Sequence, residues 1–179
     1  SGGEGYLKKE KKKINELKDG KLLAGSYEGI EIYDADKKRF SDIGKNEFPF
    51  DRVNLFYREG ADSIWVLTES GNFVKCSGKG KAVKAFNFPK LLGIDKEIPL
   101  RTVVKDNKGK FWIGTWGYGI IIFDPANERI EQIKSDENRS DGLKSNLIIS
   151  MYKDNSGIIW IGTDGQGINK YDYKKHKFG

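Results

Sequence analysis

The sequence predicts an all-β protein built from four copies of one repeat, and two sets of residues in register carry this prediction. A short apolar segment recurs four times, with 42, 47 and 48 residues between its central side chains. These central residues are Leu23, Trp65, Trp112 and Trp160. Four glycines recur in step, at spacings of 42, 48 and 48 residues: Gly29, Gly71, Gly119 and Gly167. Two independent anchors that keep one register over four copies indicate a repeat architecture.

Each copy divides into short strands separated by turn residues. The third copy shows this most clearly, with apolar or β-branched stretches at residues 100–105, 110–115, 120–123 and 129–133. Between them lie segments rich in Asp, Asn, Gly and Pro, which are typical of tight turns. Four antiparallel strands every 42 to 48 residues are the pattern of a β-propeller blade. Solenoids need helices or shorter repeats, and no segment here carries a sustained helical apolar stripe.

We therefore expect residues 1–179 to form one β-propeller segment of about four blades, each with four antiparallel strands. The approximate repeats are residues 10–46, 47–92, 93–140 and 141–179. Residues 1–9 are expected to supply a blade-closing strand, Tyr6 to Lys9, that pairs with the third strand of a last blade. The segment is then either a partial propeller that closes on itself or half of a dimeric ring of about eight blades.

The repeated Trp-Ile-Gly-Thr segments at residues 112–115 and 160–163 fit the second strand of a blade. Neighbouring blades cover both faces of such a strand, so it is almost continuously apolar. Because large aromatic side chains dominate blade cores, we expect Trp112 and Trp160 to be nearly fully buried. The small Gly-Thr pair fits a place where strands converge and bulk is not tolerated.

The composition excludes several classes of function. The chain has 179 residues, a net charge of +6, one cysteine and one histidine. A single cysteine leaves neither an intrachain disulfide nor a cysteine-rich zinc site, and a single histidine leaves no multi-histidine metal centre. We therefore expect no metal, no cofactor and no catalytic residue. The mean hydropathy of −0.63 and the strand-sized apolar runs also argue against a membrane-embedded chain.

Three lysine-rich runs, at residues 8–13, 37–39 and 174–177, raise the question of a nucleic-acid interface. The latter two fall at the same position of their repeats, in the turn before the outermost strand. Charged outer strands and turns protect sheets from edge-to-edge aggregation. Since no aromatic residues alternate with the lysines, we expect no nucleic-acid partner.

The last copy carries a motif that points to a family. Residues 154–172 read Asp-Asn-Ser-Gly-Ile-Ile-Trp-Ile-Gly-Thr-Asp-Gly-Gln-Gly-Ile-Asn-Lys-Tyr-Asp, which closely resembles the two-component regulator propeller repeat. The third copy matches nearly as well, and the first two match more loosely. The resemblance implies the sensor region of a membrane-anchored bacterial hybrid histidine kinase, on the periplasmic or extracellular side. It also implies a ligand such as a glycan fragment or another nutrient, with kinase activity confined to other parts of the parent protein.

The candidate ligand site lies in loops at one rim of the propeller, because rim loops vary while strands hold the scaffold. Trp116 stands in the loop between the second and third strands of its blade, where an exposed indole can stack on a sugar ring. The other candidates lie in equivalent loops or at the starts of blades: Tyr27, Glu69, Tyr118, Asp164, Gln166, Arg52 and Arg101.

Two other classes of function stay open at this point. A propeller-type glycan hydrolase or lyase needs paired carboxylates that converge on the axis, and Glu69 and Asp164 are the obvious loop candidates. A protein-interaction scaffold would use the same rim, and the sequence does not separate it from a sensor. We favour a non-catalytic sensor that binds an oligosaccharide or another small molecule, with a homodimer as a further expectation.

Overall fold

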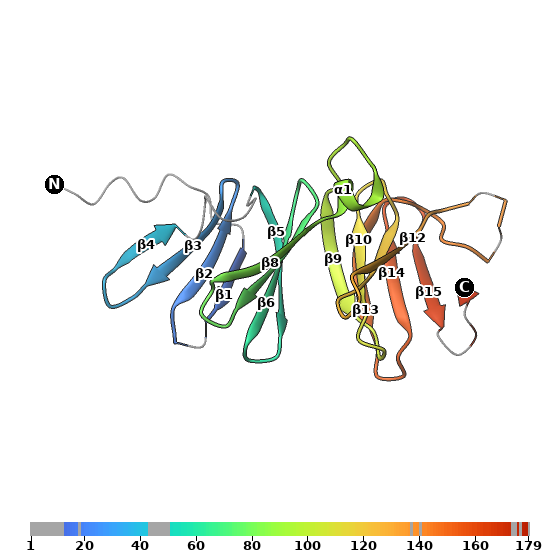
Figure 1. Cartoon of the computed structure of the whole chain (residues 1–179). Helices are drawn as coiled ribbons and strands as arrows, with labels where there is room; N and C mark the ends of the chain where they lie inside the picture. The colour runs from blue at the N-terminus through green and yellow to red at the C-terminus, as the bar shows by residue number, and fades with distance from the viewer. Residues whose placement is uncertain are drawn as a thin grey trace. The chain divides into compact units, whose positions relative to one another are not determined.

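The computed structural model describes residues 13–17, 19–42, 51–136, 138–139, 141–172, 175 and 177–178. In these ranges the chain forms four antiparallel sheets of four strands each, which follow one another in sequence order along the colours of Figure 1. In every sheet each strand pairs with the next strand along the chain, so each sheet is a simple meander. The predicted all-β fold of four-stranded blades is confirmed.

The chain divides into two compact units, and unit 1 comprises Ser1–Glu97. Its first sheet consists of β1 (Lys13–Glu16), β2 (Leu22–Ser26), β3 (Gly29–Asp34) and β4 (Arg39–Asp42). Its second sheet consists of β5 (Val53–Glu59), β6 (Ser63–Thr68), β7 (Asn72–Ser77) and β8 (Ala82–Asn87). Strand β5 contacts β1 and β2, so the two sheets pack through the start of the second.

Unit 2 comprises Ile98–Gly179 and repeats this arrangement. Its third sheet consists of β9 (Leu100–Lys105), β10 (Phe111–Thr115), β11 (Ile120–Asp124) and β12 (Arg129–Ile133). Its fourth sheet consists of β13 (Ile148–Lys153), β14 (Ile159–Thr163), β15 (Ile168–Asp172) and β16 (Lys177–Phe178). Strand β13 contacts β9 and β10, as β5 contacts the first sheet in unit 1. The Trp-Ile-Gly-Thr segments lie on β10 and β14, each second in its sheet, as predicted.

An apolar core fills the space between the third and fourth sheets. Trp112 is 2% exposed and packs with Ile120 and Ile122 of its own sheet and with Ile159 and Ile161 of the next. Its indole ring also meets the ring of Tyr171, with the two centroids 4.7 Å apart. The prediction that Trp112 is buried is therefore confirmed.

The same prediction is wrong for Trp160, whose side chain is 40% exposed. Cross-strand pairing places Trp160 opposite Tyr152 on β13 and Lys170 on β15, so these three side chains share one face of the fourth sheet. The neighbouring residues Ile159 and Ile161 point to the other face, where they join the core shared with the third sheet. Trp160 thus has the expected position in its strand, but its face of the sheet is exposed.

Close packing explains why a glycine stands at the end of the repeated apolar segment. A Cβ atom built on Gly114 would lie 2.5 Å from Cγ2 of Ile148 and 2.6 Å from Cγ2 of Thr102. In unit 1, a Cβ on Gly25 would lie 2.7 Å from Cγ1 of Val53. The first residue of the following sheet occupies the space in both units. This confirms for Gly114 the prediction that the Gly-Thr position tolerates no bulk.

One short helix, α1 (Phe88–Leu92), follows the second sheet and was missed by the sequence analysis. The side chain of Asn87 caps its N-terminus by accepting a hydrogen bond from the backbone N–H of Lys90. Gly93 ends it in the left-handed conformation, with φ at 66°. An Asn-Phe-Pro start and a glycine stop were the available signals, but five residues are too few to show a helical period.

Two expectations fall on residues outside the described ranges. They are the closing strand from Tyr6 to Lys9 and most of the first lysine run. Among the residues that are described, β15 pairs with β16 through Tyr171 with Phe178 and Asp172 with Lys177.

Candidate functional site

In unit 2 the candidate rim is built around the loop between β10 and β11. The backbone N–H of Trp116 donates to the carbonyl of Pro99 at 2.9 Å, and Trp116 also forms a β-bridge with Leu147. The backbone N–H groups of Gly117 and Gly119 both donate to the carbonyl of Asn146 at 3.0 Å. The indole of Trp116 is 40% exposed. The loop therefore presents a large aromatic side chain on a backbone that is fixed by the segments leading into β9 and β13.

Side chains close the same loop from within. The buried hydroxyl of Thr115 donates to the carbonyl of Gly119 at 2.7 Å and accepts from the backbone N–H of Tyr118 at 3.2 Å. The amide of Gln132 donates to the carbonyl of Tyr118 at 2.9 Å. A Cβ on Gly119, where φ is 73°, would lie 2.1 Å from the carbonyl oxygen of Ile133. The threonine and the glycine of the repeat thus both serve to hold this loop.

Arg101 lies beside the exposed tryptophan. Its Cζ atom is 5.8 Å from the centroid of the Trp116 ring, within the range of a cation–π interaction. At an exposed site such a contact contributes about 0.5–1 kcal/mol and restricts the rotation of both side chains. The structure brings these two predicted residues together.

The equivalent loop of the fourth sheet, between β14 and β15, lies at the same end of unit 2. The backbone N–H of Asp164 donates to the carbonyl of Leu147 at 2.9 Å, and Leu147 also bridges to Trp116. Thr163 closes this loop on the carbonyl of Gly167 at 2.9 Å, as Thr115 does in the third sheet. Asp164 and Gln166 are both exposed. The five predicted residues of unit 2 therefore share one end of its two sheets: Arg101, Trp116, Tyr118, Asp164 and Gln166.

Unit 1 repeats the arrangement with other side chains. Tyr27 occupies the position of Trp116 and is 45% exposed, and Cζ of Arg52 lies 4.8 Å from the centroid of its ring. The backbone N–H of Glu69 donates to the carbonyl of Arg52 at 2.9 Å. The Oε2 atom of Glu69 accepts a hydrogen bond from the amide of Asn54 at 2.8 Å. The predicted residues of unit 1 thus also lie together, with the arginine stacked on the tyrosine.

A chain of polar side chains near this end of unit 1 was not predicted. Asp51 accepts a hydrogen bond from the hydroxyl of Ser70, which in turn accepts from the amide of Asn72 at 2.8 Å. The Oδ1 atom of Asn72 accepts from the amide of Asn87, the cap of α1, at 2.9 Å. Asn72 is 2% exposed, so this series of hydrogen bonds satisfies buried polar groups. It also connects the segment before β5 to the start of the helix.

Three sheets share a second unpredicted feature, a carboxylate that accepts the indole N–H of the repeated tryptophan. The pairs are Glu59 with Trp65 at 2.8 Å, Asp106 with Trp112 at 3.1 Å and Asp154 with Trp160 at 2.8 Å. In each pair the residues are six positions apart, a spacing that the sequence displays. The first copy has Leu17 and Leu23 at these positions, and both are buried.

The carboxylate of Asp154 is the most strongly perturbed of these. A hydrogen bond from the hydroxyl of Ser156 and one from the indole of Trp160 lower its pKa to about 2. Its Oδ1 atom also accepts from the backbone N–H groups of Ser156 and Ile158, at 2.9 and 3.0 Å. These hydrogen bonds stabilise the turn between β13 and β14, because every donor belongs to the turn or to the segment that follows it.

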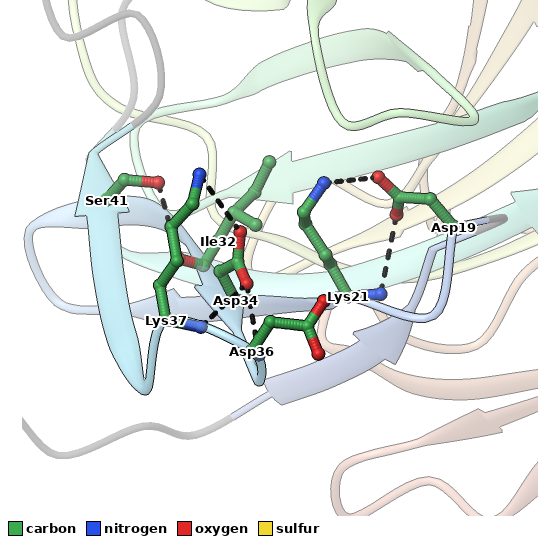
Figure 2. A network of polar contacts seen from close by, with 7 residues as sticks. All are labelled: Asp19, Lys21, Ile32, Asp34, Asp36, Lys37 and Ser41. Carbon is green, nitrogen blue, oxygen red and sulfur yellow. Dashed lines mark hydrogen bonds and ion pairs between the residues drawn. The ribbon is translucent and has the colours of Figure 1, made fainter.

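Lysines at the outer end of the first sheet lie among carboxylates, as Figure 2 shows. The ammonium of Lys37 is 3.7 Å from Oδ2 of Asp34, and that of Lys21 donates to Oδ2 of Asp19 at 2.6 Å. The backbone N–H of Lys37 donates to Oδ1 of Asp34, and this hydrogen bond lowers the pKa of Asp34. The predicted lysine turn before the outermost strand is thus also an Asp-capped turn.

Over the described ranges, no three His, Cys, Asp or Glu side chains converge as metal ligands would. The thiol of Cys76 is buried in β7, and burial raises its pKa to about 12. It therefore packs as a small apolar side chain.

Comparison with known proteins identifies the repeat. Residues 142–165 match the family model of the two component regulator propeller. The predicted resemblance to this propeller family is thus confirmed for the β14 region, which carries the Trp-Ile-Gly-Thr motif. The search of the curated proteins found no match to this chain.

Solved structures with the same fold include extracellular domains of bacterial signalling proteins. One, from a one component system of B. thetaiotaomicron, is 23% identical with a TM-score of 0.68 over 90% of this chain. Another, from a hybrid two component system of B. thetaiotaomicron, is 23% identical with a TM-score of 0.68 over 93% of this chain. This chain spans only 21% and 22% of those two chains.

Propellers of other kinds match as well. A virginiamycin B lyase from Staphylococcus aureus is 12% identical, with a TM-score of 0.62 over 93% of this chain and 53% of its own. Identities this low establish the propeller fold alone, and one fold serves many functions. Among the described residues, no helix has the length and apolar character needed to cross a bilayer.

Proposed function

We propose that this chain is an extracytoplasmic sensor module of a membrane-anchored bacterial two-component signalling protein, and that it binds an oligosaccharide without catalysing a reaction. The family match at residues 142–165 and the extracellular signalling domains among its structural neighbours support the signalling role. The observation that carries ligand binding is the exposed indole of Trp116 on a loop fixed by backbone hydrogen bonds.

The rim of unit 2 has the side chains that sugar recognition requires. An exposed indole offers a flat apolar surface to the C–H face of a sugar ring at little entropic cost, because its loop is already ordered. Asp164 and Gln166 lie at the same end and provide acceptors and a donor for hydroxyl groups. A sensor needs only to bind its ligand better in one arrangement of the parent protein than in another.

A glycan array probed with the chain, followed by calorimetry on each hit, tests this proposal. The Trp116→Ala variant is expected to bind the glycan at least about tenfold more weakly, equivalent to about 1.4 kcal/mol. Trp160→Ala is the matched control, because Trp160 is also 40% exposed but lies on a sheet face. In dilute solution the control is expected to bind like the unsubstituted chain.

Two results would contradict the proposal. Binding that is equally strong in the Trp116→Ala variant would remove this rim as the site, and the absence of any glycan hit would remove the ligand class. Cleavage of a glycan by the chain, abolished in Asp164→Asn or Glu69→Gln, would replace the sensor by the hydrolase or lyase alternative.

A further inference from the structure

The fourth sheet exposes one apolar face that the rest of unit 2 leaves uncovered. Cross-strand pairing sets Tyr152 opposite Trp160 and sets Gly162 opposite Ile168, so these side chains lie on the same side of β13, β14 and β15. We call this the open face, formed by Ser150, Tyr152, Trp160, Gly162, Ile168 and Lys170. Ile168 is 72% exposed, Tyr152 64% and Trp160 40%. Such a concentration of exposed apolar side chains marks an interaction surface.

The third sheet shows what this kind of face binds. Its residues in the same register are Thr102, Val104, Trp112, Gly114, Ile120 and Ile122. There, the fourth sheet covers the face, with the ring of Tyr171 at 4.7 Å from that of Trp112. Ile148 fills the space above Gly114. The natural occupant of such a face is therefore another blade, which presents a tyrosine to the tryptophan.

The first sheet carries the matching surface. In the fourth sheet, one face covers Trp112. The residues at the equivalent positions of the first sheet form what we call the complementary face: Ile14, Leu22, Ala24, Tyr33 and Phe40. The rings of Tyr33 and Phe40 lie 4.9 Å apart, and those of Tyr171 and Phe178 lie 5.0 Å apart. Ile14, in register with Met151, is 63% exposed. The first sheet thus reproduces the aromatic pair that seals the core between the third and fourth sheets.

The charges of the two faces have opposite signs. Lys170 stands on the open face, where the third sheet has Ile122. On the complementary face, the exposed Glu16 pairs with Leu22 across the strands. A cation on one face and a carboxylate on the other favour their association.

We propose that the open face binds the complementary face of a second copy of this chain, with Trp160 against Tyr33 of the other copy. The contact repeats the one between Trp112 and Tyr171 within unit 2. Because the two faces differ, the contact is heterologous, and two copies that each use both faces can close a ring.

Sedimentation measures the association directly. The chain is expected to form a particle of twice its 20.3 kDa mass as its concentration rises. Ile168→Lys changes the most exposed side chain of the open face and is expected to raise the dimer dissociation constant at least about tenfold. Val83→Lys is the control, because Val83 is 61% exposed on β8 and belongs to neither face. A chain that stays single at all concentrations overturns the proposal, as does equal dimerisation of Ile168→Lys.

Cross-linking identifies the partner faces. Copies with Tyr33→Cys are mixed with copies with Trp160→Cys and treated with a short bismaleimide, and a linked pair is expected. The native thiol of Cys76 does not compete, because it is buried and its pKa is raised to about 12. Val83→Cys in place of Tyr33→Cys is expected to give no linked pair. A third sample is a dilute chain that carries both substitutions. If its two cysteines become linked only within the same chain, the proposed contact with a second copy is overturned, and the two faces meet within one chain instead.

Discussion

The third and fourth sheets carry the same Trp-Ile-Gly-Thr segment, yet the tryptophan is 2% exposed in one and 40% exposed in the other. Both tryptophans occupy the second strand, and both donate their indole N–H to an aspartate six residues earlier. What differs is the neighbour, because the fourth sheet covers Trp112, whereas Trp160 lies on a face of the fourth sheet where its side chain is 40% exposed. The motif therefore sets the direction of the side chain, and the adjacent blade sets its burial.

The largest expected difference between the two sheets concerns truncation of the tryptophan. Trp112→Ala should lower the free energy of unfolding by about 3–5 kcal/mol, because it removes a buried aromatic side chain and leaves a cavity. Trp160→Ala should lower it by about 1–2 kcal/mol, because much of that ring is already in water. Chemical denaturation of both variants in dilute solution checks this. Equal losses would show that the two tryptophans are equally buried.

The glycine of the motif should respond in the same direction with a smaller effect. Gly114→Ala should cost about 1–3 kcal/mol, because its Cβ would collide with Ile148 of the next sheet and with Thr102. Gly162→Ala should cost about 0.5 kcal/mol or less, because its Cβ would meet the hydroxyl of Ser150, which can rotate away. Thermal unfolding of the two variants compares them. A larger cost at Gly162 would contradict the assignment of the open face.

The smallest expected effect is on the titration of Asp154. Its pKa is about 2 in the folded chain and 3.8 without these contacts, so its contribution to stability is present above pH 3.8 and is lost as the pH falls towards 2. Ser156→Ala should raise this pKa most, and Trp160→Phe should raise it less, following the order of the two hydrogen bonds. NMR titration of the Asp154 carboxyl measures both shifts. An unchanged pKa in Trp160→Phe would mean that the exposed indole does not hold the carboxylate.

The sequence predicts the fold well because the repeat supplies the same information four times. The strands expected at residues 100–105 and 129–133 coincide with β9 and β12. The first strand among the described residues lies at Lys13–Glu16, in a charged segment whose apolar pattern is weak, and its pairing with β2 defines it. Register anchors thus determine strands even where local composition is uninformative.

The sequence predicts the site only in part. Loop position brings Trp116 and Asp164 to one end of unit 2, since equivalent turns of adjacent sheets lie together. The stacking of Arg52 on Tyr27 depends on a contact between neighbouring sheets, which no single repeat displays. The exposure of Trp160 is likewise a property of the assembly of sheets and not of the motif.

The most direct test of the central claim is the solvent accessibility of the four indole N–H groups. NMR spectra are recorded with and without a soluble paramagnetic agent, at a concentration where sedimentation shows single chains. Trp65 and Trp112, each 2% exposed, should keep their signals, while Trp116 and Trp160, each 40% exposed, should lose theirs. A Trp160 signal as well protected as that of Trp112 in the single chain would contradict the claim that the adjacent blade decides the burial of this motif.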